Sequence, residues 1–97
     1  MLTSKQKSYL KKLAHNLTPT CQIGKDGLTE NIITDIYNYL NKHELMKVSV
    51  LQNCIYETEE IAENFKDTDI ELVQVIGRTI VLYQKSKNAK YPIVLPK

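Results

Sequence analysis

The first 17 residues have the spacing of an amphipathic helix. At about 100° per residue, the side expected to be buried carries Gln6, Leu10, Leu13, Ala14 and Leu17. The opposite side carries Lys5, Ser8, Lys11, Lys12, His15 and Asn16. Residues 3–6 have the form of a capping box, and Pro19 marks the end, because the residue before a proline avoids helical backbone angles. We therefore predict a first helix that is apolar inside and basic outside.

The next third of the chain predicts a strand, a helix and a second strand. Residues 20–23 are partly β-branched and are closed by Gly24, which indicates a short strand. A helix is predicted from residue 28 or 29 to residue 41, because one face of it carries Ile32, Ile33, Ile36, Tyr39 and Leu40. Residues 45–51, in which polar and apolar positions alternate, predict the second strand.

The remaining pattern predicts a short helix and a hairpin. Thr58 is expected to cap an acidic helix that is buried through Ile61, Ala62 and Phe65. Residues 71–76 and 79–84 predict two strands joined by a turn at residues 77–78.

The element order is α-β-α-β-α-β-β. Strand–helix–strand units cross over right-handed and make parallel pairs, so two of them in a row place their helices on one face of a sheet. We predict an α/β two-layer sandwich with a four-stranded mixed sheet and helices packed on it. The 97 residues suffice for one domain, with a core at about 2–84 and a basic tail at 85–97.

Charge is distributed unevenly along the chain. Residues 1–47 carry seven lysines and four acids, residues 48–72 one lysine and seven acids, and residues 73–97 five cations and no acid. The net charges of +3, −6 and +5 make up the formal +2 of the chain. If the fold joins the two basic ends, the resulting surface suits a polyanionic partner, while lysines that only keep the protein soluble are an equal alternative.

The cysteine count and the apolar runs bear on location. The two cysteines, Cys21 and Cys54, are too few for a disulfide framework and suit a reducing cytoplasm. The N-terminus has no apolar leader, and the apolar runs are too short to cross a membrane. We expect a cytoplasmic protein without a membrane partner.

The chain offers little for catalysis. His15 and His43 have no cysteine, serine or acid at a spacing that suggests a nucleophile pair or a metal site. Cys21 and Cys54 are interpreted as small buried hydrophobic residues, and the acids of residues 57–71 as a solvated helix face. We predict a protein that is not an enzyme, with no metal, no cofactor and no small-molecule substrate.

The loop Gly24-Lys25-Asp26-Gly27 is the sharpest local feature. Its glycines allow a tight turn and close approach of a ligand, and the following helix start favours phosphate. KH domains clamp a nucleic-acid backbone with a G-x-x-G loop of this kind. Asp26 would repel a phosphate unless it points away. Taken alone, the loop is better explained as a plain turn.

Several blocks together carry a family resemblance. They are 2–7 (LTSKQK), 22–30 (QIGKDGLTE), 43–48 (HELMKV) and 71–83 (ELVQVIGRTIVLY). In these blocks the sequence resembles the CRM domain, the chloroplast RNA-splicing and ribosome-maturation module, in its stand-alone bacterial YhbY-like form. The resemblance implies a fold similar to the C-terminal domain of translation initiation factor three. It also implies RNA binding, with bacterial members acting as assembly factors on precursors of the large ribosomal subunit.

The resemblance and the charge pattern together give a set of expected RNA-binding residues. They are Gly24, Lys25, Asp26, Gly27, Lys5, Lys11, Lys12, His15 and Arg78. We expect a monomer whose first helix and G-x-x-G loop share one continuous positive surface, with the acidic third helix away from it. The alternative is a protein–protein adaptor in ribosome assembly that docks through its acidic or apolar surface.

Overall fold

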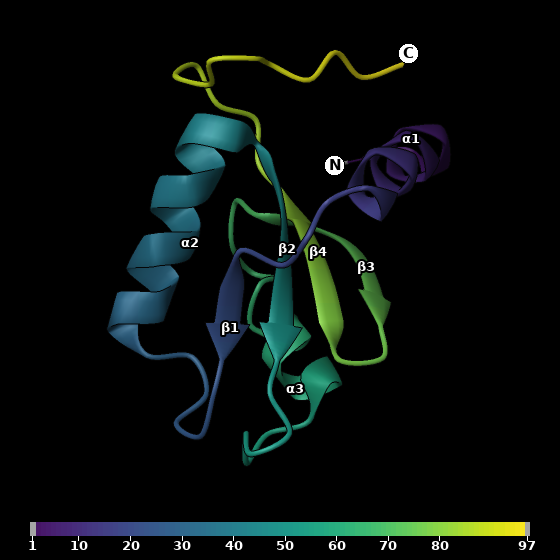
Figure 1. The fold of residues 1–97 in the computed structure, drawn as a ribbon. Helices are drawn as coiled ribbons and strands as arrows, with labels where there is room; N and C mark the ends of the chain where they lie inside the picture. The colour runs from purple at the N-terminus through teal and green to yellow at the C-terminus, as the bar shows by residue number, and fades with distance from the viewer. Residues whose placement is uncertain (1, 97) are drawn as a thin grey trace.

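A computed structural model describes residues 2–96 and contains a four-stranded sheet with helices against both of its faces (Figure 1). The elements are α1 Ser4–His15, β1 Cys21–Ile23, α2 Glu30–His43, β2 Leu45–Val50, α3 Thr58–Glu63, β3 Glu71–Ile76 and β4 Thr79–Tyr83. The predicted element order and the α/β fold class are confirmed. Within residues 2–96, no helix has the length and apolar character that crossing a membrane requires.

The sheet is mixed and has the order β1-β2-β4-β3. β1 and β2 are parallel, as expected for two strands joined through α2, and β4 is antiparallel to both β2 and β3. The predicted hairpin is present, with Gly77 in its turn at a φ of 55°. The hairpin places β4 between β2 and β3, so these two strands do not form the parallel pair that the sequence predicted.

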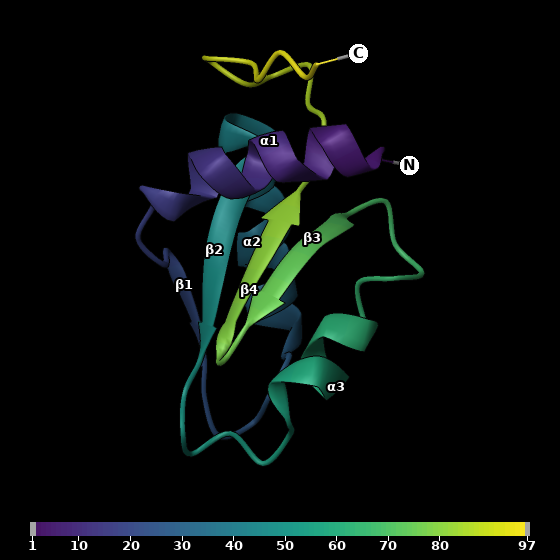
Figure 2. The ribbon, with the colours of Figure 1, turned by 90° about the vertical axis from the view of Figure 1, so that its right-hand side faces the viewer.

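The two faces of the sheet have separate apolar cores. Met46, Val48 and Val50 of β2 face the core that is shared with α2 and α3. Leu45 faces the other core, which is shared with α1. Figure 2 shows α1 lying across one end of the sheet. The two-layer arrangement of the sheet with α2 and α3 is therefore present as predicted, and α1 adds a partial layer on the opposite face.

The predicted start of α1 is confirmed in atomic detail. Thr3 Oγ1 accepts a hydrogen bond from Gln6 N at 3.1 Å, and Gln6 Oε1 accepts one from Thr3 N at 3.0 Å, which completes the capping box. Of the predicted apolar face, Leu10 and Ala14 are buried. The prediction that Leu13 and Leu17 are buried is wrong, since they are 36% and 38% exposed. They lie at the rim of the contact, because α1 covers only one end of the sheet.

The other helices differ from the prediction mainly at their ends. α2 begins after Thr29, whose Oγ1 accepts a hydrogen bond from Ile32 N at 3.2 Å, and it continues to His43, two residues beyond the predicted end. The prediction that Thr58 caps α3 is wrong. Glu57 is the N-cap and makes no side-chain capping hydrogen bond, while Thr58 is buried in the first helical position.

Glu44 ends α2 and fixes the C-terminal tail. Glu44 has left-handed backbone angles, with a φ of 65°, and is only 1% exposed. Its carboxylate accepts hydrogen bonds from the backbone N–H groups of Ser86 and Ile93, both at 2.7 Å. Ile93 and Leu95 then pack against the core that contains α1. The buried carboxylate is therefore satisfied by the tail, as a buried charge requires.

Replacing Glu44 with glutamine should destabilise the fold. Glutamine has one side-chain oxygen, so one of the two N–H groups would meet an amide N–H₂ instead of an acceptor. A buried donor without an acceptor costs about 1–3 kcal/mol, and we expect a loss of that size in urea unfolding of Glu44→Gln. The control is Glu60→Gln, at an exposed position of α3. Equal unfolding midpoints for Glu44→Gln and the parent would contradict the role given to the carboxylate.

Candidate nucleic-acid interface

The Gly24-Lys25-Asp26-Gly27 loop is a hydrogen-bonded turn. Gly27 N donates to Gly24 O at 3.0 Å, and Lys25 and Asp26 are exposed at the tip. The turn directly follows Ile23, which pairs with Val50 at the end of β2. The loop therefore lies at the end of the sheet where β1 and β2 both finish (Figure 1).

The two loop glycines have different roles. Gly27 has a φ of 70°, and a Cβ added there would lie 2.7 Å from Cδ2 and 2.8 Å from Cε2 of Tyr56. Both the left-handed backbone and the overlying ring therefore require glycine. At Gly24, an added Cβ would have its nearest neighbour, Leu51 Cδ1, at 3.8 Å, which is an ordinary contact. Tyr56 covers Gly27, so a phosphate would not reach the loop from that side.

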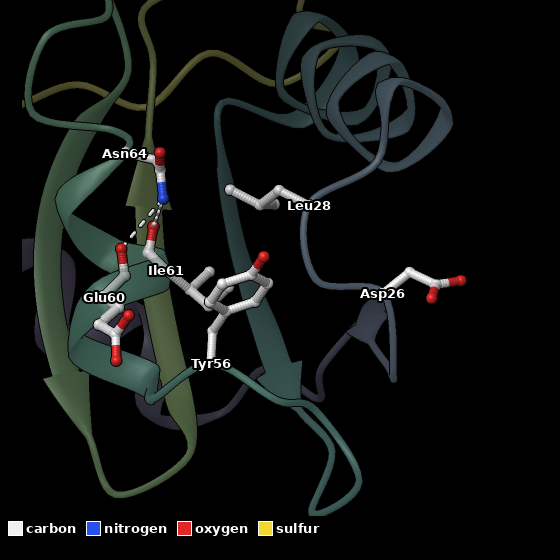
Figure 3. Close-up of a pocket in the computed structure, with 6 residues that line it drawn as sticks. All are labelled: Asp26, Leu28, Tyr56, Glu60, Ile61 and Asn64. Atoms are coloured by element: carbon white, nitrogen blue, oxygen red, sulfur yellow. Dashed lines mark hydrogen bonds between the residues drawn. The ribbon is translucent and has the colours of Figure 1, made fainter.

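A pocket of about 320 Å³ lies between the loop and α3 (Figure 3). Tyr56, Leu28 and Ile61 supply apolar groups, and Glu60 and Asp26 supply acids. In Figure 3 the Asp26 carboxylate points away from the Tyr56 ring. Glu60 makes this pocket unfavourable for phosphate, since like charges repel.

Sequence reasoning missed Tyr56. It belongs to the segment between β2 and α3, where it follows the exposed Ile55. The available signal was this apolar pair within an otherwise mostly polar connection, which the local periodicity does not assign to any face.

Arg78 lies at the same end of the sheet as the loop. It belongs to the β3–β4 turn, and its backbone oxygen accepts a hydrogen bond from Val50 N at 2.7 Å. Gly77 and Arg78 also line a second pocket together with Tyr56 and the acids Glu57 and Glu59. The fold thus brings the predicted residues 24–27 and Arg78 to one end of the sheet.

The predicted residues of α1 lie at the other end. Leu10 and Ala14 of α1 pack with Leu45 at the start of β2 and with Tyr83 at the end of β4. The outward side of α1 exposes the four predicted contacts, Lys5, Lys11, Lys12 and His15.

The expectation of one continuous positive surface over α1 and the loop is therefore wrong. The acidic helix is also beside the loop rather than away from it, since Asp26 and Glu60 line one pocket. The cause is topological: parallel β1 and β2 end at the same edge, so the loop after β1 and the segment leading from β2 to α3 emerge together.

A polar sheet surface connects the two groups of cations. Lys47 and Ser49 lie on the same face as Leu45, because side chains alternate along a strand. Ser49 pairs with Gln22 and Thr79 in the neighbouring strands, and these partners share its face. We call residues 22, 47, 49, 74 and 79 the open sheet face, because α1 leaves this part of the sheet uncovered (Figure 2). It contains one lysine and no acid, and Ile76, which pairs with Thr79 and is 56% exposed, adds an apolar side chain to this face near Arg78.

The cysteines and histidines show no arrangement typical of catalysis. Cys21 and Cys54 are free, half-buried and packed against the core of α2 and α3. Burial raises the pKa of the Cys21 thiol, and the Asp35 carboxylate raises it further, so the thiol stays protonated at neutral pH. His43 stacks on Tyr39 with ring centroids 4.3 Å apart. Across residues 2–96, no group of three or more histidines, cysteines and acids is placed to hold a metal ion.

The protein is a small α/β domain with a G-x-x-G turn at one end of its mixed sheet. Comparison with known proteins identifies its family. The family model of the CRS1 / YhbY (CRM) domain matches residues 2–84. The chain belongs to the CRM domain family, which confirms the resemblance seen in the sequence blocks.

Similar proteins occur in several bacteria. The chain is 50% identical over 91 residues to "Probable RNA-binding protein YqeI" of Bacillus subtilis, covering 93% of this chain and 95% of that protein. It is 44% identical over 98 residues to an "RNA-binding protein" of Haemophilus influenzae, covering 99% and 96%. The solution structure of the hypothetical protein SAV1595 from Staphylococcus aureus superimposes with a TM-score of 0.80 at 52% identity, covering 99% of this chain and 100% of that one.

Substitution of the two loop glycines should separate their roles. Gly27→Ala should lower the free energy of unfolding by at least about 1–2 kcal/mol, the usual cost of a left-handed backbone with a Cβ, with the Tyr56 contact adding to it. Gly24→Ala should leave stability unchanged or raise it by about 0.4–1 kcal/mol, since its backbone accepts alanine. Urea unfolding of both variants measures the difference.

A double mutant tests the contact with Tyr56. In a Tyr56→Ala background the ring atoms that meet the new Cβ are gone, so Gly27→Ala should cost less than it does in the parent. Equal costs in the two backgrounds would mean that Tyr56 does not impose the glycine.

Proposed function

We propose that this protein is a non-enzymatic RNA-binding domain that holds structured RNA on the side of the sheet that carries α1. The observation that carries the proposal is the composition of α1: four lysines, one histidine and no acid in 12 residues. Its predicted contacts are exposed, so they are free to meet phosphates. The relatives named as RNA-binding proteins support the same function.

Charge favours this side over the opposite one. The open sheet face continues from α1 through Lys47 toward Arg78 and carries no acid. The side of α3 exposes Glu57, Glu59, Glu60 and Glu63, which repel a polyanion. The contacts proposed here are to phosphates, and such contacts position RNA without reading its sequence.

The G-x-x-G turn is proposed to supply a further contact at the far end of this surface. Lys25 is exposed at the tip, and the open surroundings of Gly24 leave room for a backbone to approach. The start of α2 contributes less than a free helix end would. Thr29 already occupies the N–H of Ile32, and the Glu30 carboxylate lies in the first turn.

We infer further that the RNA is ribosomal and that the protein acts, as a cytoplasmic monomer, on precursors of the large ribosomal subunit. The support is the match of residues 2–84 to the CRM family and the resemblance to its stand-alone bacterial form. The alternative, a protein adaptor, would use the acidic α3 and the neighbouring exposed Ile55. Such docking would depend far less on salt than phosphate contact does.

The salt dependence of binding tests the proposal. With four lysines in contact (Lys5, Lys11, Lys12 and Lys25), a plot of log affinity against log salt for a structured RNA should have a slope of roughly −2 to −4. Lys11→Ala, Lys12→Ala and Lys25→Ala should each weaken binding and remove about one unit of slope.

Lys66→Ala provides the matched control. It removes the same charge, but Lys66 Nζ is paired with Glu63 Oε1 at 2.7 Å on α3. Its affinity and slope should remain those of the parent. A flat salt plot for the parent, or equal losses for Lys66→Ala and Lys12→Ala, would rule out phosphate binding on the α1 side.

A further inference from the structure

The C-terminal tail forms a pinned loop that lies beyond the family match. The match ends at residue 84, whereas the described chain continues against the domain to residue 96. The two oxygens of Glu44 hold the N–H groups of Ser86 and Ile93, so one carboxylate fixes both ends of the loop 87–92. Ser86 Oγ also donates to Asn41 O at 2.6 Å, and Asn88 Nδ2 donates to Asn41 Oδ1 at 3.2 Å. The loop is therefore held over the C-terminal end of α2 (Figure 1).

This loop closes one side of a groove of about 340 Å³, which we call the tail groove. Leu13 of α1 and Leu17, just after this helix, form one wall, Tyr39 comes from the end of α2, and Tyr91 and Ile93 come from the tail. These are the same two leucines that were predicted to be buried and are exposed. The groove therefore has apolar walls and is built from three segments far apart in the sequence.

The rim of the tail groove is positive. Lys42 and Lys90 line it, and none of the lining residues within 2–96 is acidic. The Tyr91 ring is 79% exposed, and Lys90 Nζ lies 5.7 Å from its centroid. An exposed ring beside cations and over an apolar surface offers both a stacking platform and contacts for negative charge.

A single unpaired nucleotide combines the chemistry that this surface offers. Its base has a flat face for an aromatic side chain, and its flanking phosphates suit lysines. A base within a duplex is already stacked and would leave Tyr91 unused. An acidic peptide would satisfy the lysines but provides no flat ring for Tyr91.

We propose that the tail groove binds an unpaired nucleotide of RNA, with the base stacked on Tyr91 and the neighbouring phosphates at Lys42 and Lys90. This inference rests on the proposed RNA-binding function and deepens it. Because Leu13 directly follows Lys11 and Lys12, and Leu17 lies about one helical turn further on, an RNA held on α1 can place a single-stranded extension in the groove.

Two RNAs test the inference: a blunt hairpin, and the same hairpin with a single-stranded extension of four uridines. The parent should bind the extended RNA about fivefold or more tighter than the blunt one, the range expected for stacking on one aromatic ring. Tyr91→Ala should remove that difference, and Tyr91→Phe should keep it. Lys42→Ala should reduce it, and the affinity for the blunt hairpin should be the same in all Tyr91 variants.

The control variant is Val94→Ala, because Val94 is 82% exposed in the same tail but does not line the groove. It should bind both RNAs as the parent does. Thermal melting should show that the Tyr91 variants are as stable as the parent, since the ring is largely in solvent.

The possible failures are distinct. Equal affinity of the parent for both RNAs, or a preference for the extension that survives in Tyr91→Ala, overturns the tail groove while RNA binding stands. Absence of binding to either RNA overturns the proposed function itself. If the uridine extension adds nothing but a hexaglutamate peptide binds in a Tyr91-dependent manner, the groove belongs to an acidic protein segment and the nucleotide assignment is wrong.

Discussion

The pairing of β4 between β2 and β3 is the constraint on which the rest of the structure depends. All four residues from Ile80 to Tyr83 are buried, two on each face of the sheet. Ile80 and Leu82 complete the core under α2 and α3, while Val81 and Tyr83 complete the core under α1. A strand that is covered on both faces has a continuous run of apolar residues, so polar and apolar positions do not alternate along β4. Without it, the core under α1 would lose Val81 and Tyr83.

This arrangement also separates the charges. The covering of one face by α2 and α3 brings the acidic turn of α3 beside the end of β1 and β2. The covering of the other face by α1 presents lysines to solvent, and the uncovered part of that face adds Lys47. The basic ends of the chain therefore meet a polyanion from one side of the sheet. The G-x-x-G turn lies at the boundary between the basic side, which carries α1, and the acidic side, which carries α3. Lys25 is exposed at this boundary, and Asp26 lines a pocket together with Glu60.

Much of the fold could be predicted from the sequence, because its signals are local. The capping box at residues 3–6, the alternation in β2 and the positive φ of the turn glycine Gly27 each depend on neighbours within a few positions. The order of the strands could not be predicted, since it depends on which long-range pairing buries the most apolar surface. α1 lies across the end of the sheet opposite the loop, so the continuous positive surface was wrong although the basic residues predicted to bind RNA are all exposed.

Two structural features, the roles of Tyr56 and Glu44, could not be predicted from the sequence for a related reason. Tyr56 matters because of Gly27, which is 29 positions away in the chain, and neither residue signals the other. Glu44 holds left-handed backbone angles that usually favour glycine, and only its contacts with Ser86 and Ile93 explain a glutamate there. From the sequence, the tail was predicted only as a basic segment. In the structure it forms one wall of a groove.

The most direct test of the central claim is a map of backbone amide chemical shifts of the labelled protein as a structured RNA hairpin is added. RNA held on the α1 side of the sheet predicts large changes at Lys11, Lys12 and Lys47 and at the Arg78 turn. The chemical shifts of the α3 amides around Glu60 and Glu63 should remain unchanged. Changes concentrated on α3, with α1 and the open sheet face unmoved, would contradict the account.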